Sequence, residues 1–466
     1  MSFLLDVAYA AGLAVLSPVW LYRMIRHGRY RSGIAQRLGA APVRHGLQPT
    51  IWIHGVSLGE INAARTLVAE IHRQLPDYRV VVSSTTDTGM TAARKLFAPD
   101  HIVFQWPLDF TLSVRAALRR IRPSLVVTIK GEVWPNFLAA CNRCKVPVVV
   151  VNGRMSADKG YPRYKLLGPL AAKLFNRLTA IGVQDVAYAA RFQSLGVDAD
   201  RVQVTGMLKY DTAGVADHVE GDEALSAAMG LTVQDRLIVA GGTGPGEEAI
   251  LLDLYRRLKA KHAQARLAIV PRKPERFDEV ARLITSASFP LMRRTEHADG
   301  LGTGEACRSA LSEVGRTAGE TPATRADKMS TPPVLLGDTM GELRKFYSLA
   351  TYVFVGRSLV PMGGSDMIES AALGKATAFG PHTFNFPQAA DLARNGCVQV
   401  ADAAALERQL DAWLSDPTAA GAAGKQAQQF VRSQQGATKR NVEMICRVLG
   451  RVPAMSEGGI ATDAIG

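Results

Sequence analysis

The 466-residue sequence contains few cysteines and fewer acidic than basic residues. Its five cysteines are an odd and sparse set, which excludes a disulfide framework and is typical of a reducing compartment. Cys141 and Cys144 form a Cys-x-x-Cys pair, but no second pair or spaced histidines complete a zinc site, so we predict a structural role. The 42 acidic residues face 55 basic ones, and the net charge of +13 favours an anionic partner.

That partner belongs to one of three classes: nucleic acid, a phosphate-rich small molecule, or an anionic membrane surface. No nucleic-acid-binding module is evident, and the arginines gather beside an apolar segment instead of interleaving with aromatic residues. We therefore expect no nucleic-acid partner. The length and the 47% hydrophobic content are those of a globular protein with two or three domains, which excludes a fibrous repeat and a polytopic membrane protein.

The N-terminal segment 1–30 combines an apolar run with a basic end. Residues 7–22 carry no charge, and Trp20 and Tyr22 stand at their end as interfacial aromatics do, although Pro18 interrupts the run. We predict a membrane-anchor helix, either spanning or tilted and partly inserted; the alternative is a first helix buried on the protein body. The basic cluster that follows would stay on the cytoplasmic face: Arg23, Arg26, Arg29, Arg31 and Arg37.

Apolar, β-branched runs alternate with helical stretches along the rest of the chain, which is typical of parallel sheets covered on both faces. We predict an α/β protein with two Rossmann-like, doubly wound domains, 31–222 and 223–466, that face a cleft. Residues 293–333 contain no aromatic residue and are rich in small and charged ones. We expect this segment to be a flexible insertion.

Ligands of such sheets bind beyond the carboxyl ends of the strands, so the residues that follow the strands are the candidates for chemistry. The first strand ends in HGVSLGE, which places Glu60 in the first turn of a helix. The alternative role for Glu60 is the stabilisation of that helix start. Lys130 and Glu132 follow the fourth strand in the same way.

In the second half, the glycine-rich strings 241–248 and 363–369 each precede a predicted helix, and Arg272 follows a strand. Amide groups of a glycine turn at a helix start can bind phosphate. Neither string has the spacing of a dinucleotide or P-loop fingerprint, so each is a weak motif by itself.

The motifs in combination resemble one family. They are HGVSLGE (54–60), STTDTGM (84–90), GEVWPN (131–136), NGRMS (152–156), RFQSLGV (191–197), GMLKYD (206–211), PRKPERF (271–277), GDTMGEL (337–343), FVGRSLVPMGG (354–364) and GPHTFNF (380–386). In this order they resemble the 3-deoxy-D-manno-oct-2-ulosonic acid (Kdo) transferases of lipopolysaccharide assembly, which have the two-domain GT-B fold.

The resemblance implies an inverting, metal-independent and cofactor-free transfer of Kdo from CMP-Kdo to a hydroxyl of a lipid A precursor, at the cytoplasmic face of the inner membrane. By this resemblance, Glu60 is the catalytic base and Lys209 stabilises the departing CMP. Lys130 and Glu132 are further catalytic residues. The CMP contacts that it implies are Pro271, Arg272, Met340, Gly341, Glu342, Gly363, Gly364, Ser365, Asp366 and Glu369.

Two departures from the family pattern leave alternatives open. Lys130 stands where the family usually has a carboxylate, and Ser365 with Asp366 replaces a His-Asn pair. One alternative is therefore a catalytically silent paralogue that binds a nucleotide or an anionic lipid. Another is a sugar-nucleotide epimerase on the same fold.

Overall fold

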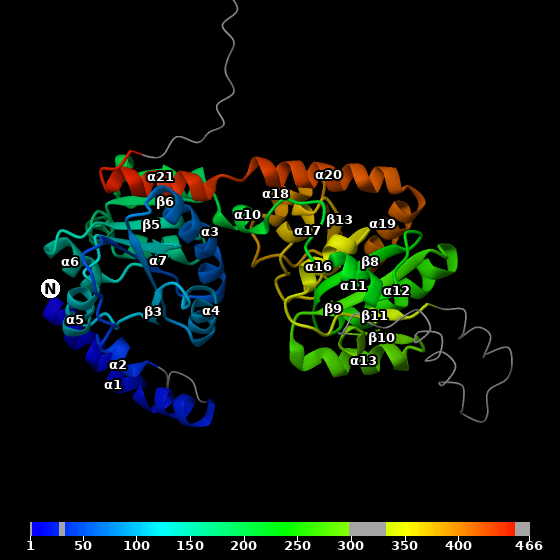
Figure 1. The fold of residues 1–466 in the computed structure, drawn as a ribbon, viewed down its shortest axis with the longest axis horizontal. Coiled ribbons are helices and arrows are strands. Elements are labelled where there is room, and N and C mark those ends of the chain that lie inside the picture. Colours follow the sequence, from blue (N-terminus) through cyan, green and yellow to red (C-terminus); the bar gives the residue numbers. More distant parts are fainter. Residues whose placement is uncertain (1, 28–32, 298–331, 453–466) are drawn as a thin grey trace, which may run out of the picture. The chain divides into compact units, whose positions relative to one another are not determined.

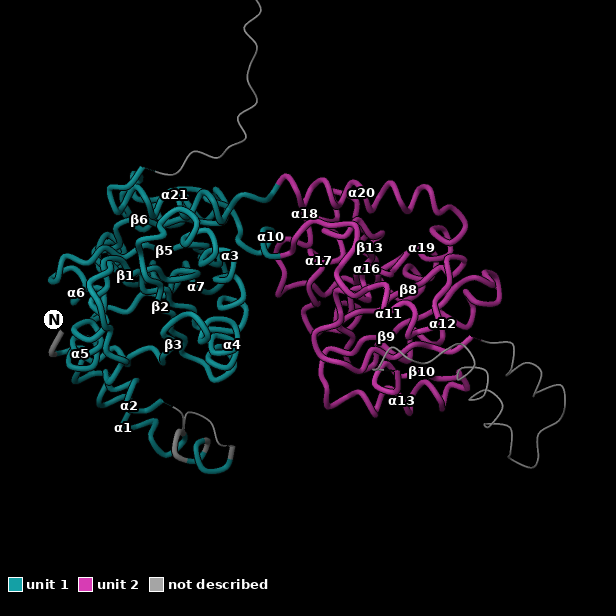
Figure 2. The backbone as a smooth tube through the Cα atoms, viewed as in Figure 1, with its two compact units in different colours: residues 1–212, 434–466 teal, residues 213–433 magenta. Residues whose placement is uncertain are grey.

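The computed structural model describes residues 2–27, 33–297 and 332–452. The chain forms two compact units, of which the first combines 1–212 with 434–466 and the second is 213–433 (Figure 2). The sequence placed the boundary at 222/223 and gave the whole C-terminal end to the second domain. The structure instead divides the chain at 212/213 and returns its last helix to the first unit.

Unit 1 is built on a seven-stranded parallel sheet of order β3-β2-β1-β4-β5-β6-β7. The central strands β1 and β4 are buried along their whole length, which explains their continuous apolar runs. The strands are β1 (Thr50–His54), β2 (Arg79–Ser84), β3 (Ile102–Gln105), β4 (Leu125–Ile129), β5 (Val148–Gly153), β6 (Ala180–Val183) and β7 (Val202–Val204).

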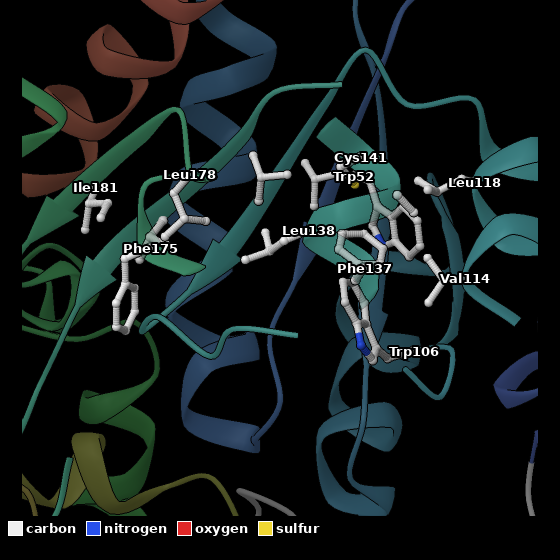
Figure 3. Packing of buried hydrophobic residues seen from close by; sticks show 14 of the residues in the cluster. Trp52, Trp106, Val114, Leu118, Phe137, Leu138, Cys141, Phe175, Leu178 and Ile181 are labelled. Carbon is white, nitrogen blue, oxygen red and sulfur yellow. The ribbon is translucent and has the colours of Figure 1, made fainter. Parts of the chain in front are cut away.

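Helices cover both faces of this sheet (Figure 1). On one face Trp52 packs against Trp106 and Phe137, with ring centroids 5.1 and 5.4 Å away (Figure 3). The helices are α2 (Ile34–Arg37), α3 (Leu58–Gln74), α4 (Asp87–Phe97), α5 (Thr111–Ile121), α6 (Pro135–Arg143), α7 (Gly160–Leu166), α8 (Pro169–Phe175), α9 (Val186–Ser194), α10 (Leu208–Ala213) and α21 (Ala437–Val448).

Helix α21 belongs to unit 1 because its apolar side completes the core of the other sheet face. Val442 and Ile445 are fully buried in the same cluster as Ile51 and Ile53 of β1. The side chain of Asp211 accepts hydrogen bonds from the Gly436 and Thr438 amides at the start of this helix. Contacts over more than two hundred residues of chain therefore decide where the C-terminal helix packs.

Unit 2 has a second seven-stranded parallel sheet, of order β10-β11-β9-β8-β12-β13-β14. Its strands are β8 (Arg236–Thr243), β9 (Ala265–Pro271), β10 (Leu291–Arg293), β11 (Val334–Leu336), β12 (Tyr352–Val355), β13 (Ala376–Phe379) and β14 (Val398–Gln399). Its helices are α11 (Asp222–Ala228), α12 (Glu247–Lys261), α13 (Phe277–Ser286), α16 (Leu343–Leu349), α17 (Ile368–Ala372), α18 (Ala389–Arg394), α19 (Ala403–Ser415) and α20 (Pro417–Ser433).

The expected insertion 293–333 falls mostly on residues 298–331, which lie outside the described residues. Its first residues are ordered by ion pairs: Arg293 contacts Asp338 at 2.7 Å, and Arg294 contacts Glu342 at 2.9 Å. The start of the segment is thus a structured end of β10.

Helix α1 (Ser2–His27) meets α5 and α6 of the unit. The Asp6 side chain accepts a hydrogen bond from the Thr111 amide at 3.0 Å, and Tyr9 donates one to Asp109 at 3.2 Å. Most of the helix is exposed, so it is not the buried first helix of the alternative prediction. No helix among the described residues is long and apolar enough to cross a membrane.

Candidate functional site

The turns that follow β1 and β4 in unit 1 meet where the strand order of the sheet reverses. Strands β1 and β4 are neighbours at the centre of the sheet, and the chain runs outward from them in opposite directions. The crevice at their carboxyl ends is the usual ligand site of open α/β sheets. Glu60 follows β1 and Lys130 follows β4, and the Lys130 Nζ atom lies 3.4 Å from Glu60 Oε1.

Glu60 is held by the turn that precedes α3. Its Oε2 accepts a hydrogen bond from the Val56 amide at 2.7 Å, and its Oε1 accepts one from the Ser57 hydroxyl at 3.0 Å. The side chain is 7% exposed, whereas that of Lys130 is 47% exposed. The carboxylate therefore has a fixed orientation, and it is in reach of the lysine at the rim of the sheet.

The turn after β4 is conformationally special. Lys130 has φ 79° and Gly131 has φ 98°, two successive residues in the left-handed region. The Lys130 amide donates a hydrogen bond to the Val151 carbonyl of β5, and the Lys130 carbonyl accepts one from the Arg154 amide just after β5, which fixes the backbone. Glu132, which follows Gly131, is exposed. Partial desolvation and the negative charge of Glu60 raise the pKa of the Glu132 carboxyl, and the positive charge of Lys130 opposes this rise. Glu60, Lys130 and Glu132 thus form one charged group.

Sequence reasoning assigned no role to the turn after β2, yet this turn supports the Glu60 turn. The Val56 carbonyl accepts hydrogen bonds from the Thr86 hydroxyl at 2.8 Å and the Ser84 hydroxyl at 3.2 Å. Thr86 also caps α4 through the Gly89 amide. The motif STTDTGM marks this turn in the sequence. Its contact with the Glu60 turn becomes visible only in the fold, where β1 and β2 are parallel neighbours.

Lys209 lies on α10, which follows the edge strand β7. It is half-buried, and the amide of its neighbour Leu208 bonds to Asn152 Oδ1 at 3.2 Å. Asn152 is the penultimate residue of β5, so the start of α10 is tied to the carboxyl end of the sheet. Lys209 is therefore at the same edge as Glu60 but on a different turn.

The corresponding reversal in unit 2 lies between β8 and β12, and one buried carboxylate joins the turns that follow them. Glu247 has no exposed surface, and it accepts hydrogen bonds from the amides of Gly244, Ser358 and Leu359 at 2.8–3.0 Å and from that of Arg357. Burial raises its pKa and these hydrogen bonds oppose the rise. The sequence did not single out Glu247, although it is the first helical residue after a glycine-rich turn.

The residues expected to contact CMP lie at this edge of the second sheet. Pro271 ends β9 and is buried, whereas Arg272 is exposed and its amide bonds to the Thr243 carbonyl. Burial is the main cause of the raised pKa of the Tyr347 hydroxyl. The negative charges of Glu369 and Asp366 raise this pKa further, and the positive charge of Arg272 lowers it. All three residues therefore contribute to the electrostatic environment of Tyr347.

The glycine turn 363–364 requires its glycines. Gly363 has φ 87° and Gly364 has φ 84°, and a Cβ at Gly363 would meet the Asn385 side chain at 2.1 Å. Ser365 is 3% exposed, and its hydroxyl bonds to the Gly242 carbonyl at 2.8 Å. Asp366 accepts a hydrogen bond from the Ile368 amide at the start of α17.

The loop after β11 contains Met340, which is 71% exposed, and Gly341, with φ 92°. The Glu342 carboxylate contacts Arg294 at 2.9 Å and Thr339 at 2.5 Å. Burial by itself raises the pKa of Glu342, but the hydrogen bonds and the charge of Arg294 outweigh burial and lower it. The Glu342 carboxylate thus stabilises this loop.

Neither unit shows a metal centre: in the parts of the chain that the structure describes, no group of three or more His, Cys, Asp or Glu residues could hold a metal ion. Cys141 is buried in the core on α6, where burial raises the pKa of its thiol, and Cys144 is exposed. Cys141 thus lies in the core, and the structural role of the pair stays a prediction.

Comparison with known proteins identifies the family of this chain. Residues 32–212 match the profile of a family described as 3-deoxy-D-manno-octulosonic-acid transferase (kdotransferase). The chain is 32% identical over 455 residues to the 3-deoxy-D-manno-octulosonic acid transferase of Bordetella pertussis, which covers 94% of this chain and 97% of the relative. The enzyme of the same name from Haemophilus influenzae is 29% identical over 436 residues, 92% and 94% of the two chains.

Among solved structures, a glycosyltransferase from Rickettsia africae aligns with a TM-score of 0.56 at 13% identity, over 87% of this chain and 99% of that one. This likeness shows the GT-B-like fold, which confirms the two doubly wound sheets that the sequence predicted. The resemblance drawn from the motifs is confirmed as well, and the epimerase alternative falls away. The chain therefore belongs to the 3-deoxy-D-manno-octulosonic acid transferase family and is a glycosyltransferase.

Proposed function

We propose that this enzyme transfers Kdo from CMP-Kdo to a hydroxyl of a lipid A precursor in the assembly of the lipopolysaccharide core, with inversion and without a metal ion. Family membership supports the sugar that is transferred. The observation that carries the chemistry is the Glu60 carboxylate, oriented by two hydrogen bonds at the sheet crevice and 3.4 Å from Lys130.

In the proposed reaction Glu60 removes the proton of the acceptor hydroxyl. The hydroxyl oxygen forms a bond to the anomeric carbon of Kdo while the bond from that carbon to the CMP phosphate oxygen breaks, and CMP leaves with the electron pair. Positioned general bases of this kind typically accelerate a reaction about 10²–10⁴-fold. Lys130 orients the carboxylate through Oε1, and Glu132 adds an acidic group beside it.

Unit 2 holds the donor in this proposal. Arg272 supplies positive charge and the backbone of the turn at Gly363 and Gly364 supplies amide groups for the phosphate. By the family resemblance, the role of Lys209 is to stabilise the negative charge of departing CMP. Ser365 acts indirectly, because its hydroxyl is bonded to the backbone of β8. The remaining donor contacts are Pro271, Met340, Gly341, Glu342, Asp366 and Glu369.

Membrane association follows from α1. The exposed side chains of this helix include Val15, Leu16 and Ile25, which are 77%, 52% and 68% exposed. A helix of 26 residues is about 39 Å long, and apolar residues along it suit a helix lying in the membrane interface. We propose that α1 binds the anionic cytoplasmic surface of the inner membrane, where the lipid acceptor resides.

The test is Glu60→Gln assayed with CMP-Kdo and a lipid A precursor, with the product identified by mass spectrometry. We expect a loss of about 10²–10⁴ in kcat with unchanged CMP affinity. Glu70→Gln on the same helix is the control, since Glu70 bonds to its neighbours Arg73 and Gln74 and not to the turn that holds Glu60. Full activity of E60Q would refute the assigned base. A wild type that binds CMP but glycosylates no acceptor would support the silent paralogue instead.

A further inference from the structure

The turn between α7 and α8, residues 165–170, exposes three leucines. Leu166, Leu167 and Leu170 are 88%, 46% and 59% exposed, and every residue of the α7–α8 turn is exposed. Gly168, with φ 50°, separates the two helices, and Pro169 begins α8. Single exposed apolar residues are normal, but three leucines within five residues form a patch, and such patches mark interaction surfaces.

The helices below this turn are firmly packed. The rings of Tyr164 on α7 and Phe175 on α8 meet edge to face, with centroids 4.8 Å apart, and Phe175 packs in the same way against Phe192 of α9 at 5.2 Å. Phe175 is fully buried in one cluster with Phe137 of α6 (Figure 3). The leucines are therefore held outward by a packed pair of helices.

Positive charge surrounds the apolar turn. The segment 159–177 contains no aspartate or glutamate. Arg163 lies three residues before Leu166 on α7, so these two side chains are neighbours on the helix surface. Lys173 lies three residues after Leu170 on α8 in the same way. Apolar side chains within a basic surround are complementary to an anionic lipid bilayer. The basic residues are Lys159, Arg163, Lys165, Lys173 and Arg177.

The segment that leads to this turn starts beside the proposed catalytic group. The Arg154 amide, just after β5, donates a hydrogen bond to the Lys130 carbonyl at 3.1 Å. The Ser156 hydroxyl then accepts one at 3.0 Å from the amide of Gly160, where α7 begins. The α7–α8 turn and the turn of Lys130 thus follow neighbouring strands, β5 and β4, at the carboxyl edge of one sheet.

Helices α7 and α8 also lie on the side of the sheet that carries α1. Phe175 of α8 and Phe137 of α6 share one buried cluster, and α1 packs against α5 and α6. Leu5 of α1 and Arg177, two residues after α8, line the same pocket. The two exposed apolar elements of unit 1 are therefore neighbours, and one flat surface can contact both.

We propose that the α7–α8 turn inserts Leu166, Leu167 and Leu170 into an anionic bilayer, while the basic side chains around it contact lipid phosphates. The proposal rests on the proposed membrane association of α1, to which it adds a second contact. A single helical contact leaves unit 1 free to rotate about the helix axis, whereas two contacts fix its orientation. The crevice of Glu60 is then held near the headgroup layer in which the acceptor hydroxyl lies.

The direct test places a tryptophan at the turn and measures its quenching by lipids with brominated acyl chains, in vesicles that contain phosphatidylglycerol. The fluorescence that Leu166→Trp adds to that of the five native tryptophans should be quenched. Leu47→Trp is the control, because Leu47 is fully exposed and its neighbour Gln48 bonds to Arg79 at the amino end of β2. Absence of quenching in L166W, or equal quenching in L47W, would overturn the proposal.

Vesicle partition measures the apolar contribution. The double variant Leu166→Ser, Leu170→Ser should partition at least about ten-fold more weakly onto these vesicles, the factor expected for loss of one or two buried leucines. Both side chains are exposed in the protein, so an unchanged melting temperature shows that the variant is folded. Partition equal to that of wild type would overturn the insertion of the turn.

The basic side chains contribute separately. Arg163→Gln, Lys165→Gln should weaken partition about five-fold for each charge removed, and less at high salt. Arg94→Gln, Lys95→Gln makes the same change at exposed positions of α4, a helix whose buried residues belong to the core of the opposite sheet face. An equal loss in this control would reduce the effect to net charge and overturn the role of the turn.

Turnover and mass separate the bilayer from other occupants of the turn. With acceptor dispersed in detergent, L166S/L170S should keep kcat and KM within about two-fold of wild type. A raised KM would assign the leucines to the acyl chains of the acceptor, and a lower molar mass in light scattering would assign them to a second copy of the chain. Either result would overturn the proposal. Quenching of L166W in an enzyme that glycosylates no acceptor would refute the proposed function and support the insertion.

Discussion

At the residue scale, Glu60 combines two roles that the sequence left as alternatives. It lies three residues after Ser57, the residue that precedes α3, and it accepts hydrogen bonds from the Val56 amide and the Ser57 hydroxyl of that turn. The same bonds hold the carboxylate at the crevice, next to Lys130. A helix-start residue and a proposed base are therefore compatible, because stabilising the turn also orients the base.

Thr86 provides a test of how much this orientation contributes. Thr86→Ala removes the hydrogen bonds to the Val56 carbonyl and from the Gly89 amide, so we expect a loss of about 1 kcal/mol of stability and about ten-fold in kcat. Thr86→Ser keeps the hydroxyl and should restore both. Thermal unfolding and steady-state assays measure the two effects, and an unchanged kcat in T86A would limit Thr86 to capping α4.

Asp109 is predicted to make stability depend on pH. Burial raises its pKa from 3.8 to about 6, against the opposing hydrogen bonds from Asn136, Phe137 and Tyr9. Between about pH 4 and 6 the folded state holds a proton that the unfolded chain releases, so the free energy of unfolding falls as pH rises through this window.

The variant Asp109→Asn lacks the pH-dependent contribution of the Asp109 carboxyl to the free energy of unfolding. The melting temperature of D109N relative to wild type should therefore increase from pH 4 to pH 7, by an amount equivalent to on the order of 2 kcal/mol. The control Asp100→Asn, at an exposed position, should show a constant offset. A constant offset for D109N as well would contradict the prediction.

At the element scale, single buried side chains join turns that the chain order separates. Asp211 caps α21 across 225 residues of sequence, and Glu247 joins the turn after β8 to the turn after β12. Apolar periodicity predicts each helix and strand by itself, but it does not say which turn a carboxylate contacts. The misplaced boundary at 222/223 arose from this limit.

Glu247→Ala should therefore destabilise unit 2 more than an ordinary surface change. It leaves the amides of Gly244, Ser358 and Leu359 without their acceptor, at a cost of about 3 kcal/mol or more. Thermal unfolding measures the loss, and calorimetry should show weaker CMP binding because the turn after β12 is released. Glu275→Ala, at an exposed position in the same unit, should change neither.

At the scale of the whole molecule, net charge and exposed apolar surface point to one environment. The charge of +13 favoured an anionic partner, and α1 exposes apolar side chains that no described part of the protein covers. No described helix is long and apolar enough to cross a membrane, and α1 has exposed apolar side chains. This combination is that of a helix lying in the membrane interface.

The double variant Val15→Ser, Leu16→Ser should reduce partition onto anionic vesicles at least about ten-fold, because burying one such side chain contributes roughly 1.5–3 kcal/mol. Its melting temperature should match that of wild type, since both side chains are exposed. Leu47→Ser, at a fully exposed position away from α1, is the control for vesicle sedimentation. Unchanged partition of the double variant would assign membrane binding to another surface.

The sequence by itself determined the two parallel sheets, the family and the order of the candidate turns, because these depend on local periodicity and on contiguous motifs. Only the tertiary structure decided that α21 returns to unit 1, that Lys130 lies beside Glu60, and that Ser365 bonds to the backbone of β8. Each of these pairs is separated by about seventy residues or more, and packing of strands and helices, not local preference, brings its members together.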